Sequence, residues 1–132
     1  TIFNNIMISA EYELIDYSTA EYFTGDLEQE NIIINSIYQR TENIKLGAEI
    51  NIKPFVIRTG YSNYGSAFLE KDFSRKNFSY GVGINNGGYF FDVCYILSQG
   101  ETEDLLYGED YINPISLINT NHNLIFTLGF RY

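Results

Sequence analysis

Seven charged residues occur within segments that are otherwise rich in apolar residues, and their side chains can form ion pairs. They are Glu11, Glu13, Lys45, Glu49, Arg58, Asp92 and Arg131. We expect Glu49 to pair with Arg58 across a hairpin and Asp92 to pair with Arg131 on a neighbouring strand, which would fix strand register. A guanidinium also binds a carboxylate in a bidentate manner, so Arg58 or Arg131 is a candidate contact for an acidic ligand.

The sequence offers few groups for catalysis or metal binding. His122 is the single histidine, placed by the pattern in a loop, and Cys94 is the single cysteine. Neither a Ser-His-Asp nor a Cys-His arrangement nor a thiolate metal cage is expected from them. Glu11 and Glu13 lie two positions apart on one segment without an evident cleft, and the acidic run at 101–110 lacks EF-hand spacing. We predict no enzyme activity, no metal site and no cofactor.

Composition limits the class of protein. The 132 residues suit one domain rather than two. With 17 Asp and Glu against 8 Lys and Arg, the formal charge of −9 argues against a nucleic-acid partner. Twelve Tyr, 10 Phe and only 2 Pro favour strands. Because no apolar run approaches the roughly 18 residues of a spanning helix, any crossing of a membrane would use strands.

Apolar and polar residues alternate with a period of two in six segments, which predicts six strands. The segments are 6–14, 44–52, 55–62, 78–84, 89–97 and 124–132. Tight turns are expected at 53–54 and 85–88, and long polar connections at 17–43, 63–77 and 98–122. Residues 32–40 fit either a strand extension or a short helix. Alternation of short and long connections is typical of transmembrane barrels.

The two faces of the predicted strands differ in chemistry. No position on the apolar face is charged, whereas the seven charges share the opposite face with Gly47, Gly60, Gly81, Gly83 and Gly129. A soluble β-sandwich also has apolar faces, but small residues beside opposite charges favour a crowded barrel interior. Charges facing lipid near mid-depth would cost about 2–4 kcal/mol even for Lys or Arg. Four tyrosines would then lie at the membrane interfaces: Tyr61, Tyr80, Tyr95 and Tyr132.

The last nine residues, LIFTLGFRY at 124–132, end in an aromatic residue after alternating hydrophobic residues. They resemble the C-terminal signal by which bacterial outer-membrane proteins reach the barrel-assembly machinery, and the signal would be carried by Leu124, Phe126, Leu128, Phe130 and Tyr132. Upstream segments follow one another as NIKLGAE at 43–49, IRTGY at 57–61, FSYGVG at 78–83 and FDVCY at 91–95. In order and spacing they resemble the closing strands of the FadL/OmpP1/TodX family of transporters for long-chain fatty acids and hydrocarbons. The Asn-, Ile- and Tyr-rich style is similar to members from Bacteroidetes.

The resemblance implies an all-β fold, a transmembrane antiparallel up-and-down β-barrel in the bacterial outer membrane, crossed several times. Residues 1–132 would supply about six C-terminal strands of a larger barrel, which has fourteen strands in that family, with no separate second domain. The remaining strands would come from the same gene product, after cleavage in a loop, or from another chain. The family's hatch is N-terminal, so no substrate-binding residue is carried over to this sequence.

Three functions are compatible with these observations. The first is a passive channel portion for long-chain fatty acids or other hydrophobic small molecules, whose partners would be outer-membrane lipid, the N-terminal remainder of the barrel and the ligand. The second, which some relatives of this family perform, is a non-transporting barrel that acts as a scaffold in a secretion or surface-lipoprotein complex. The third is a soluble β-sandwich binding module.

Overall fold

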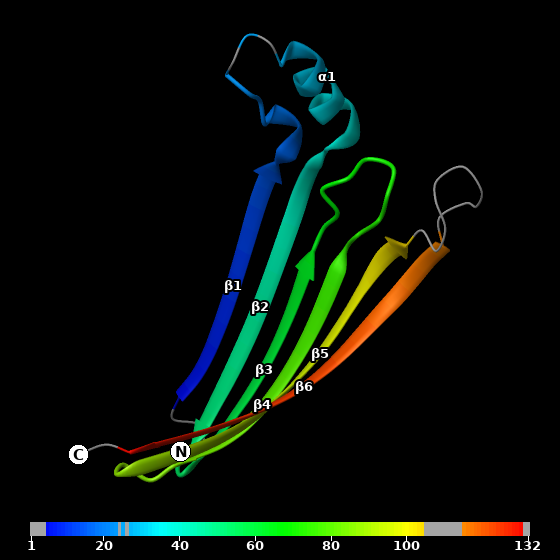
Figure 1. The fold of residues 1–132 in the computed structure, drawn as a ribbon. Coiled ribbons are helices and arrows are strands. Elements are labelled where there is room, and N and C mark those ends of the chain that lie inside the picture. The colour runs from blue at the N-terminus through cyan, green and yellow to red at the C-terminus, as the bar shows by residue number, and fades with distance from the viewer. Residues whose placement is uncertain (1–4, 24, 26, 105–114, 131–132) are drawn as a thin grey trace.

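The chain forms a single six-stranded antiparallel sheet in the computed structural model, which describes residues 5–23, 25, 27–104 and 115–130. The strands are β1 (Asn5–Asp16), β2 (Arg40–Ile52), β3 (Phe55–Tyr64), β4 (Arg75–Asn85), β5 (Tyr89–Asp104) and β6 (Ile115–Phe130). They pair in chain order as a meander, and the sheet is not closed. Figure 1 shows a strongly curved sheet with its strands side by side. The six predicted strands are therefore confirmed, whereas the structure shows no barrel.

Short turns lie at one end of the sheet, called here the turn end. Lys53 and Pro54 connect β2 to β3, and the connection from β4 to β5 contains Gly87 at φ 78°, a left-handed conformation that glycine adopts without strain. Both turns were expected from the sequence. The opposite end, called the loop end, carries the connections from β1 to β2 and from β3 to β4 (Figure 1).

The connection from β1 to β2 contains two short helices, η1 (Tyr17–Thr19) and α1 (Glu28–Ile37). Residues 32–40, which the sequence left open, thus contribute mainly to a helix. Two glutamates in the first turn of α1 complement the helix dipole. The Asn31 side chain ties the helix to the preceding segment, because it accepts from the Tyr22 N–H at 2.8 Å and donates to the Tyr22 carbonyl at 3.1 Å.

Three predicted connections were too long. β2 begins at Arg40, β3 and β4 extend into 63–77, and β5 and β6 extend far into 98–122. His122 consequently lies in β6 and not in a loop. The reason is that these strand ends are polar on both faces, so the alternation that marks a half-buried strand is missing although the backbone pairing continues.

The loop end is held together by hydrogen bonds between the two described connections. The Gln39 N–H donates to the Ala67 carbonyl and the Leu69 N–H donates to the Ile37 carbonyl, both at 2.8 Å. The rings of Tyr38 and Phe68 lie 5.0 Å apart beside an isolated β-bridge. In the same connection, hydrogen bonds from the Ser74 hydroxyl and N–H hold the pKa of Asp72 below its usual value.

The sheet has hardly any core of its own. Val56 is the one buried apolar side chain among the described residues, and Thr41 and Asn43 are the buried polar ones. In Figure 1 the helices lie beyond the loop end of β1 and β2 and do not cover a face of the sheet. None of the described helices is long and apolar enough to cross a membrane. Neither face of the sheet is covered by another layer of the described residues, so both faces contact the protein's surroundings.

Candidate functional site

Strand pairing places Glu11, Glu13, Lys45, Glu49, Arg58 and Asp92 on one face of the sheet, called here the charged face. Lys45 lies opposite Glu11, and the two side chains form an ion pair with an Nζ–Oε1 distance of 2.7 Å. The next carboxylate along β1, on Glu13, accepts a hydrogen bond of 2.8 Å from the Asn43 amide. Each of these acidic groups is thus satisfied by the adjacent strand β2.

Arg58 joins three strands on this face. Its Nε donates to the carboxylate of Glu49 on β2 at 2.7 Å, and its Nη1 donates to the carboxylate of Asp92 on β5 at 2.5 Å. The expected pair of Glu49 and Arg58 is therefore present. Because both ends of the Arg58 guanidinium are occupied by protein carboxylates, this residue is a poor candidate for the contact with an acidic ligand.

The structure pairs Asp92 with Arg58. The pair of Asp92 and Arg131 expected from the sequence stays a prediction, because Arg131 lies outside the described residues. On β6, the residue directly opposite Asp92 is Thr127. Arg58 reaches Asp92 across β4 because the intervening residues, Gly81 and Gly83, carry no side chain. Arg131 and Tyr132 lie outside the described residues.

Glycines on the charged face make room for side chains from neighbouring strands. A Cβ built on Gly83 would collide with the Asp92 carboxylate, and one built on Gly129 would collide with the Phe90 ring. Likewise, Cβ atoms on Gly47 and Gly60 would lie 2.6 Å from the hydroxyl oxygens of serines on β1 and β4. Polar and aromatic side chains therefore lie flat across the sheet in this region.

Replacing Gly83 by alanine is expected to destabilise the fold by about 1 kcal/mol, because the new methyl group forces Asp92 away from Arg58. Gly81→Ala is the matched control, since a Cβ at Gly81 meets only atoms at 3.6 Å, an ordinary contact. Denaturant unfolding of both variants under identical conditions measures the difference. Equal stabilities would contradict the proposed contact.

The opposite face, called here the apolar face, exposes large hydrophobic side chains on all six strands. Examples are Ile8 at 79%, Ile57 at 49%, Val82 at 58% and Phe126 at 62% exposure. Ile50, Ile57, Val82 and Val93 form one continuous row across the central strands. No second layer of the described chain covers these side chains, so folding of this sheet alone leaves the apolar face in contact with its surroundings.

The apolar face changes character towards the loop end. The last largely apolar row runs from Ala10 on β1 to His122 on β6, through Leu46, Tyr61, Phe78 and Leu97. In the next row, β3 to β6 carry polar residues: Asn63, Lys76, Gln99 and Thr120. The apolar part, called here the apolar band, spans nine residues on β2, from Ile44 to Ile52, and seven on β3, from Phe55 to Tyr61. A strand that crosses a bilayer needs about 9–11 residues.

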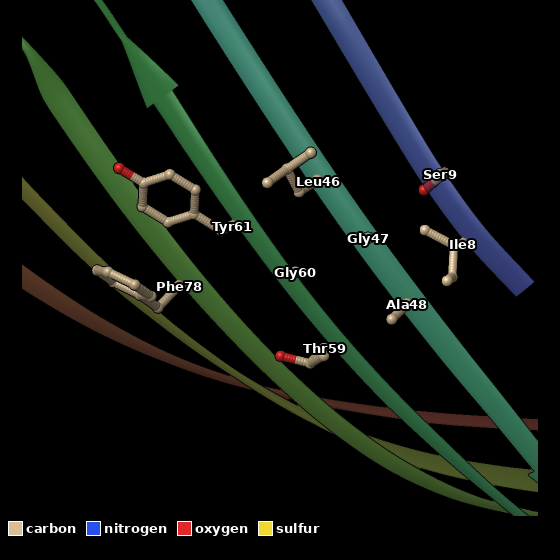
Figure 2. Close-up of a pocket in the computed structure, with 9 residues that line it drawn as sticks. All are labelled: Ile8, Ser9, Leu46, Gly47, Ala48, Thr59, Gly60, Tyr61 and Phe78. Carbon is tan, nitrogen blue, oxygen red and sulfur yellow. The ribbon is translucent and has the colours of Figure 1, made fainter.

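A shallow apolar depression of about 310 Å³ lies on this band (Figure 2). It forms over the small side chains of Ala48 and Thr59, with Ile8 and Leu46 at its borders. Tyr61 and Phe78 close one side, and their ring centroids are 4.9 Å apart. The backbone pairing of β2 and β3 continues through this region, so the depression is a surface feature and not an opening in the sheet.

His122 and Tyr95 satisfy each other on the apolar face. The Tyr95 Oη and His122 Nδ1 atoms are 2.6 Å apart. Tyr95 on β5 pairs with Leu124, and His122 lies two residues before Leu124 on the same face of β6. A polar group on an apolar surface costs free energy unless it has a hydrogen-bond partner. The pair therefore explains how the single histidine is tolerated at the edge of the apolar band.

Tyr95→Phe is expected to destabilise the protein by about 1 kcal/mol, since it leaves the His122 ring nitrogen without this partner. The double variant with His122→Leu should recover most of that loss, because both polar groups are then removed. Thermal unfolding of the two variants under identical conditions measures the coupling. A double variant less stable than Tyr95→Phe would contradict this account.

The remaining sequence-predicted residues occupy the turn end of β6. Leu124, Phe126, Leu128 and Phe130 share the apolar face and are all more than half exposed, whereas the fifth residue of the predicted assembly signal, Tyr132, lies outside the described residues. Arg75, which begins β4 on the charged face, was not among the predicted site residues. It lies in a polar segment where apolar and polar residues do not alternate, so the sequence pattern did not assign it to a strand.

Comparisons with protein-family models, with curated proteins and with solved structures found no match for this chain.

Proposed function

We propose that this chain forms part of an outer-membrane β-barrel that passes long-chain fatty acids or other hydrophobic small molecules through its lumen. In this arrangement the apolar face contacts lipid and the charged face lines the lumen. About eight further strands would pair with the open edges of the present sheet if the barrel has the fourteen strands expected from the sequence resemblance.

One observation carries the proposal: a continuous apolar band is exposed on one face of a single-layered sheet, while charges are paired on the other. Water would make such a surface unfavourable, by about 25 cal/mol for each Å² of apolar area. Hydrocarbon chains remove that cost. The polar row at Lys76 and its neighbours would then emerge from the membrane towards the loop end.

The edges of the sheet support further strands. β1 and β6 are each paired on one side only, so the other side of each carries unsatisfied backbone groups. In a bilayer those groups require partners, because water is absent there. Closing a barrel takes at least about eight strands, and six are described here. We therefore propose that strands outside residues 1–132 pair with both edges.

The ligand class comes from the sequence resemblance to the FadL/OmpP1/TodX family. The charged face is compatible with a passive wall, because Arg58, Lys45 and their carboxylate partners satisfy one another and leave no unpaired charge in the middle of the described sheet. A hydrophobic molecule would pass along such a wall without displacing an ion from it.

Uptake of a radiolabelled long-chain fatty acid tests the proposal. Cells that lack the gene are expected to take up the label several-fold more slowly than cells complemented with it, at equal membrane integrity. Unchanged uptake would contradict transport and would favour the scaffold function, which predicts instead the loss of a surface lipoprotein or secreted protein from the same cells.

A fractionation experiment tests the membrane setting separately. The protein is expected in the outer-membrane fraction, and its release is expected to require detergent rather than salt or carbonate. A soluble β-sandwich predicts the opposite, since its apolar faces would pack on each other and leave the protein in the aqueous fraction.

A further inference from the structure

Arg75 differs from the other cations on the charged face. Arg58 and Lys45 each form ion pairs with carboxylates, whereas none of the three ion pairs among the described residues includes Arg75. Strand pairing places Arg75 opposite Tyr64 on one side and opposite Gly100 on the other. Arg75 thus lies on the charged face near the loop end, above the paired charges.

The contact with Tyr64 holds the guanidinium without using its hydrogen bonds. The Arg75 guanidinium carbon lies 5.1 Å from the centroid of the Tyr64 ring, a cation–π contact. Interaction with an aromatic face engages the π-surface of the guanidinium, while its five N–H donors point outward in the plane of the group. The side chain is therefore oriented, and its donors remain available.

Most of the side chains around the pocket beside Arg75 are neutral and polar. This pocket of about 210 Å³ is lined by Ser98 on β5 and by Asn119 and Asn121 on β6. Gly100 contributes no side chain and so leaves space next to the stem of Arg75. Glu101 also borders the pocket. Because successive residues of a strand point to opposite faces and Gly100 is on the charged face, Glu101 belongs to the apolar face of β5.

The carboxylates that form described contacts on the charged face lie away from Arg75. Glu11, Glu13 and Glu49 are on β1 and β2, and Asp92 is near the turn end of β5, where Arg58 binds it. The position of Asp104 belongs to this face by alternation but lies four residues beyond Gly100, about 13 Å along β5. Hydroxyl and amide groups beside an unpaired guanidinium form a set of hydrogen-bond donors suited to an anion. A planar carboxylate matches the fork of a guanidinium in shape.

We propose that Arg75, with Ser98, Asn119 and Asn121, forms an anion site that binds the carboxylate of an amphipathic acid at the loop end of the lumen. The proposal rests on the proposed function for the location of the lumen and for the apolar tail of the ligand. The site would select acids over uncharged hydrophobic molecules and would orient them with the head group towards the loop end.

The test compares Arg75→Gln with Lys76→Gln. Both variants remove one positive charge, and the two residues are neighbours on β4 that point to opposite faces. Binding of dodecanoate and of dodecanol to the protein purified from its native host, together with any chain that co-purifies, is measured by displacement of a radiolabelled ligand in nanodiscs. Inorganic phosphate serves as a competitor without an apolar tail.

Arg75→Gln is expected to raise the Kd for dodecanoate about tenfold and to leave the Kd for dodecanol unchanged, because it removes a charge-assisted pair of hydrogen bonds. Lys76→Gln should change neither Kd.

An unchanged Kd for dodecanoate in Arg75→Gln, or an equal rise in Lys76→Gln, would overturn the anion site while leaving the proposed transport function intact. Arg75-dependent binding of phosphate without binding of dodecanoate would overturn the choice of ligand. Binding of neither dodecanoate nor dodecanol to the wild-type protein would overturn the proposed function and the site together.

Discussion

Ile8→Arg is expected to lower the free energy of unfolding in a bilayer by about 2–4 kcal/mol, the cost of placing a cation on the lipid face of a barrel near mid-depth. Ile8 is 79% exposed and lies in the same row as Ala48 and Thr59, within the apolar band. Tyr80 and Tyr95 share this row, one row inside the edge of the band and not at the edge expected from the sequence. A loss of this size reduces the ratio of folded to unfolded protein by roughly 30-fold or more. Folding into lipid vesicles, followed by urea titration, measures it.

Ser9→Arg is the matched control, because Ser9 is the next residue of β1 and belongs to the charged face, opposite Gly47. There the new guanidinium would meet polar groups and the water of the proposed lumen, and we expect a much smaller loss of stability. A comparable loss in both variants would show that the two faces do not differ in their surroundings.

Ile8→Trp separates a lipid surface from a protein core. A larger side chain in a packed core costs about 1–3 kcal/mol, because close-packed neighbours have to move. Lipid chains rearrange around a larger side chain, so Ile8→Trp is expected to be close to neutral in a membrane. Destabilisation of Ile8→Trp beyond about 1 kcal/mol would contradict the lipid-facing assignment and favour a sandwich core.

Arg58→Gln is expected to cost about 2 kcal/mol, since it leaves the carboxylates of Glu49 and Asp92 without the cation that joins them. Breaking a fully buried ion pair costs more, about 3–5 kcal/mol. The smaller value is appropriate because the Arg58 side chain is 46% exposed in this sheet and solvent screens the interaction. Chemical unfolding in detergent gives the measurement.

A second substitution tests the cause of that loss. Adding Asp92→Asn to Arg58→Gln removes one unpaired carboxylate, and we expect part of the stability to return. Arg75→Gln provides the control on the same face, because Arg75 belongs to no ion pair of the described residues and its loss should leave the unfolding midpoint nearly unchanged. An Arg58→Gln variant as stable as Arg75→Gln would rule out a structural role for the three-strand network.

The strands that alternate strongly were predictable, and those that do not were missed. Within 6–14, apolar residues face one side and Glu11 and Glu13 face the other, so the periodicity of two identified β1 at once. The loop-end part of β5, SQGETED at 98–104, has polar residues on both sides and was taken for a loop. Backbone pairing with β6 makes it a strand regardless of its side chains.

The helix α1 shows a different limit. Its three consecutive isoleucines, Ile32 to Ile34, favour a strand by propensity, whereas the structure contains a helix from Glu28 to Ile37. Acidic residues in its first turn and the side-chain hydrogen bonds of Asn31 favour the helix. Such contacts depend on a segment nine residues away, and the local pattern does not contain them.

The sequence by itself determined that six strands alternate between an apolar and a charged face, because the direction of a side chain in a strand depends only on whether its position is odd or even. Which charges meet was decided by the tertiary structure. Asp92 binds Arg58 because the register of β3, β4 and β5 places Gly81 and Gly83 between them. Arg75 belongs to none of the ion pairs among the described residues, and the same register puts Gly100 beside it. Register is set between two neighbouring strands by the turn that joins them and by the pattern of both, so no single strand encodes it.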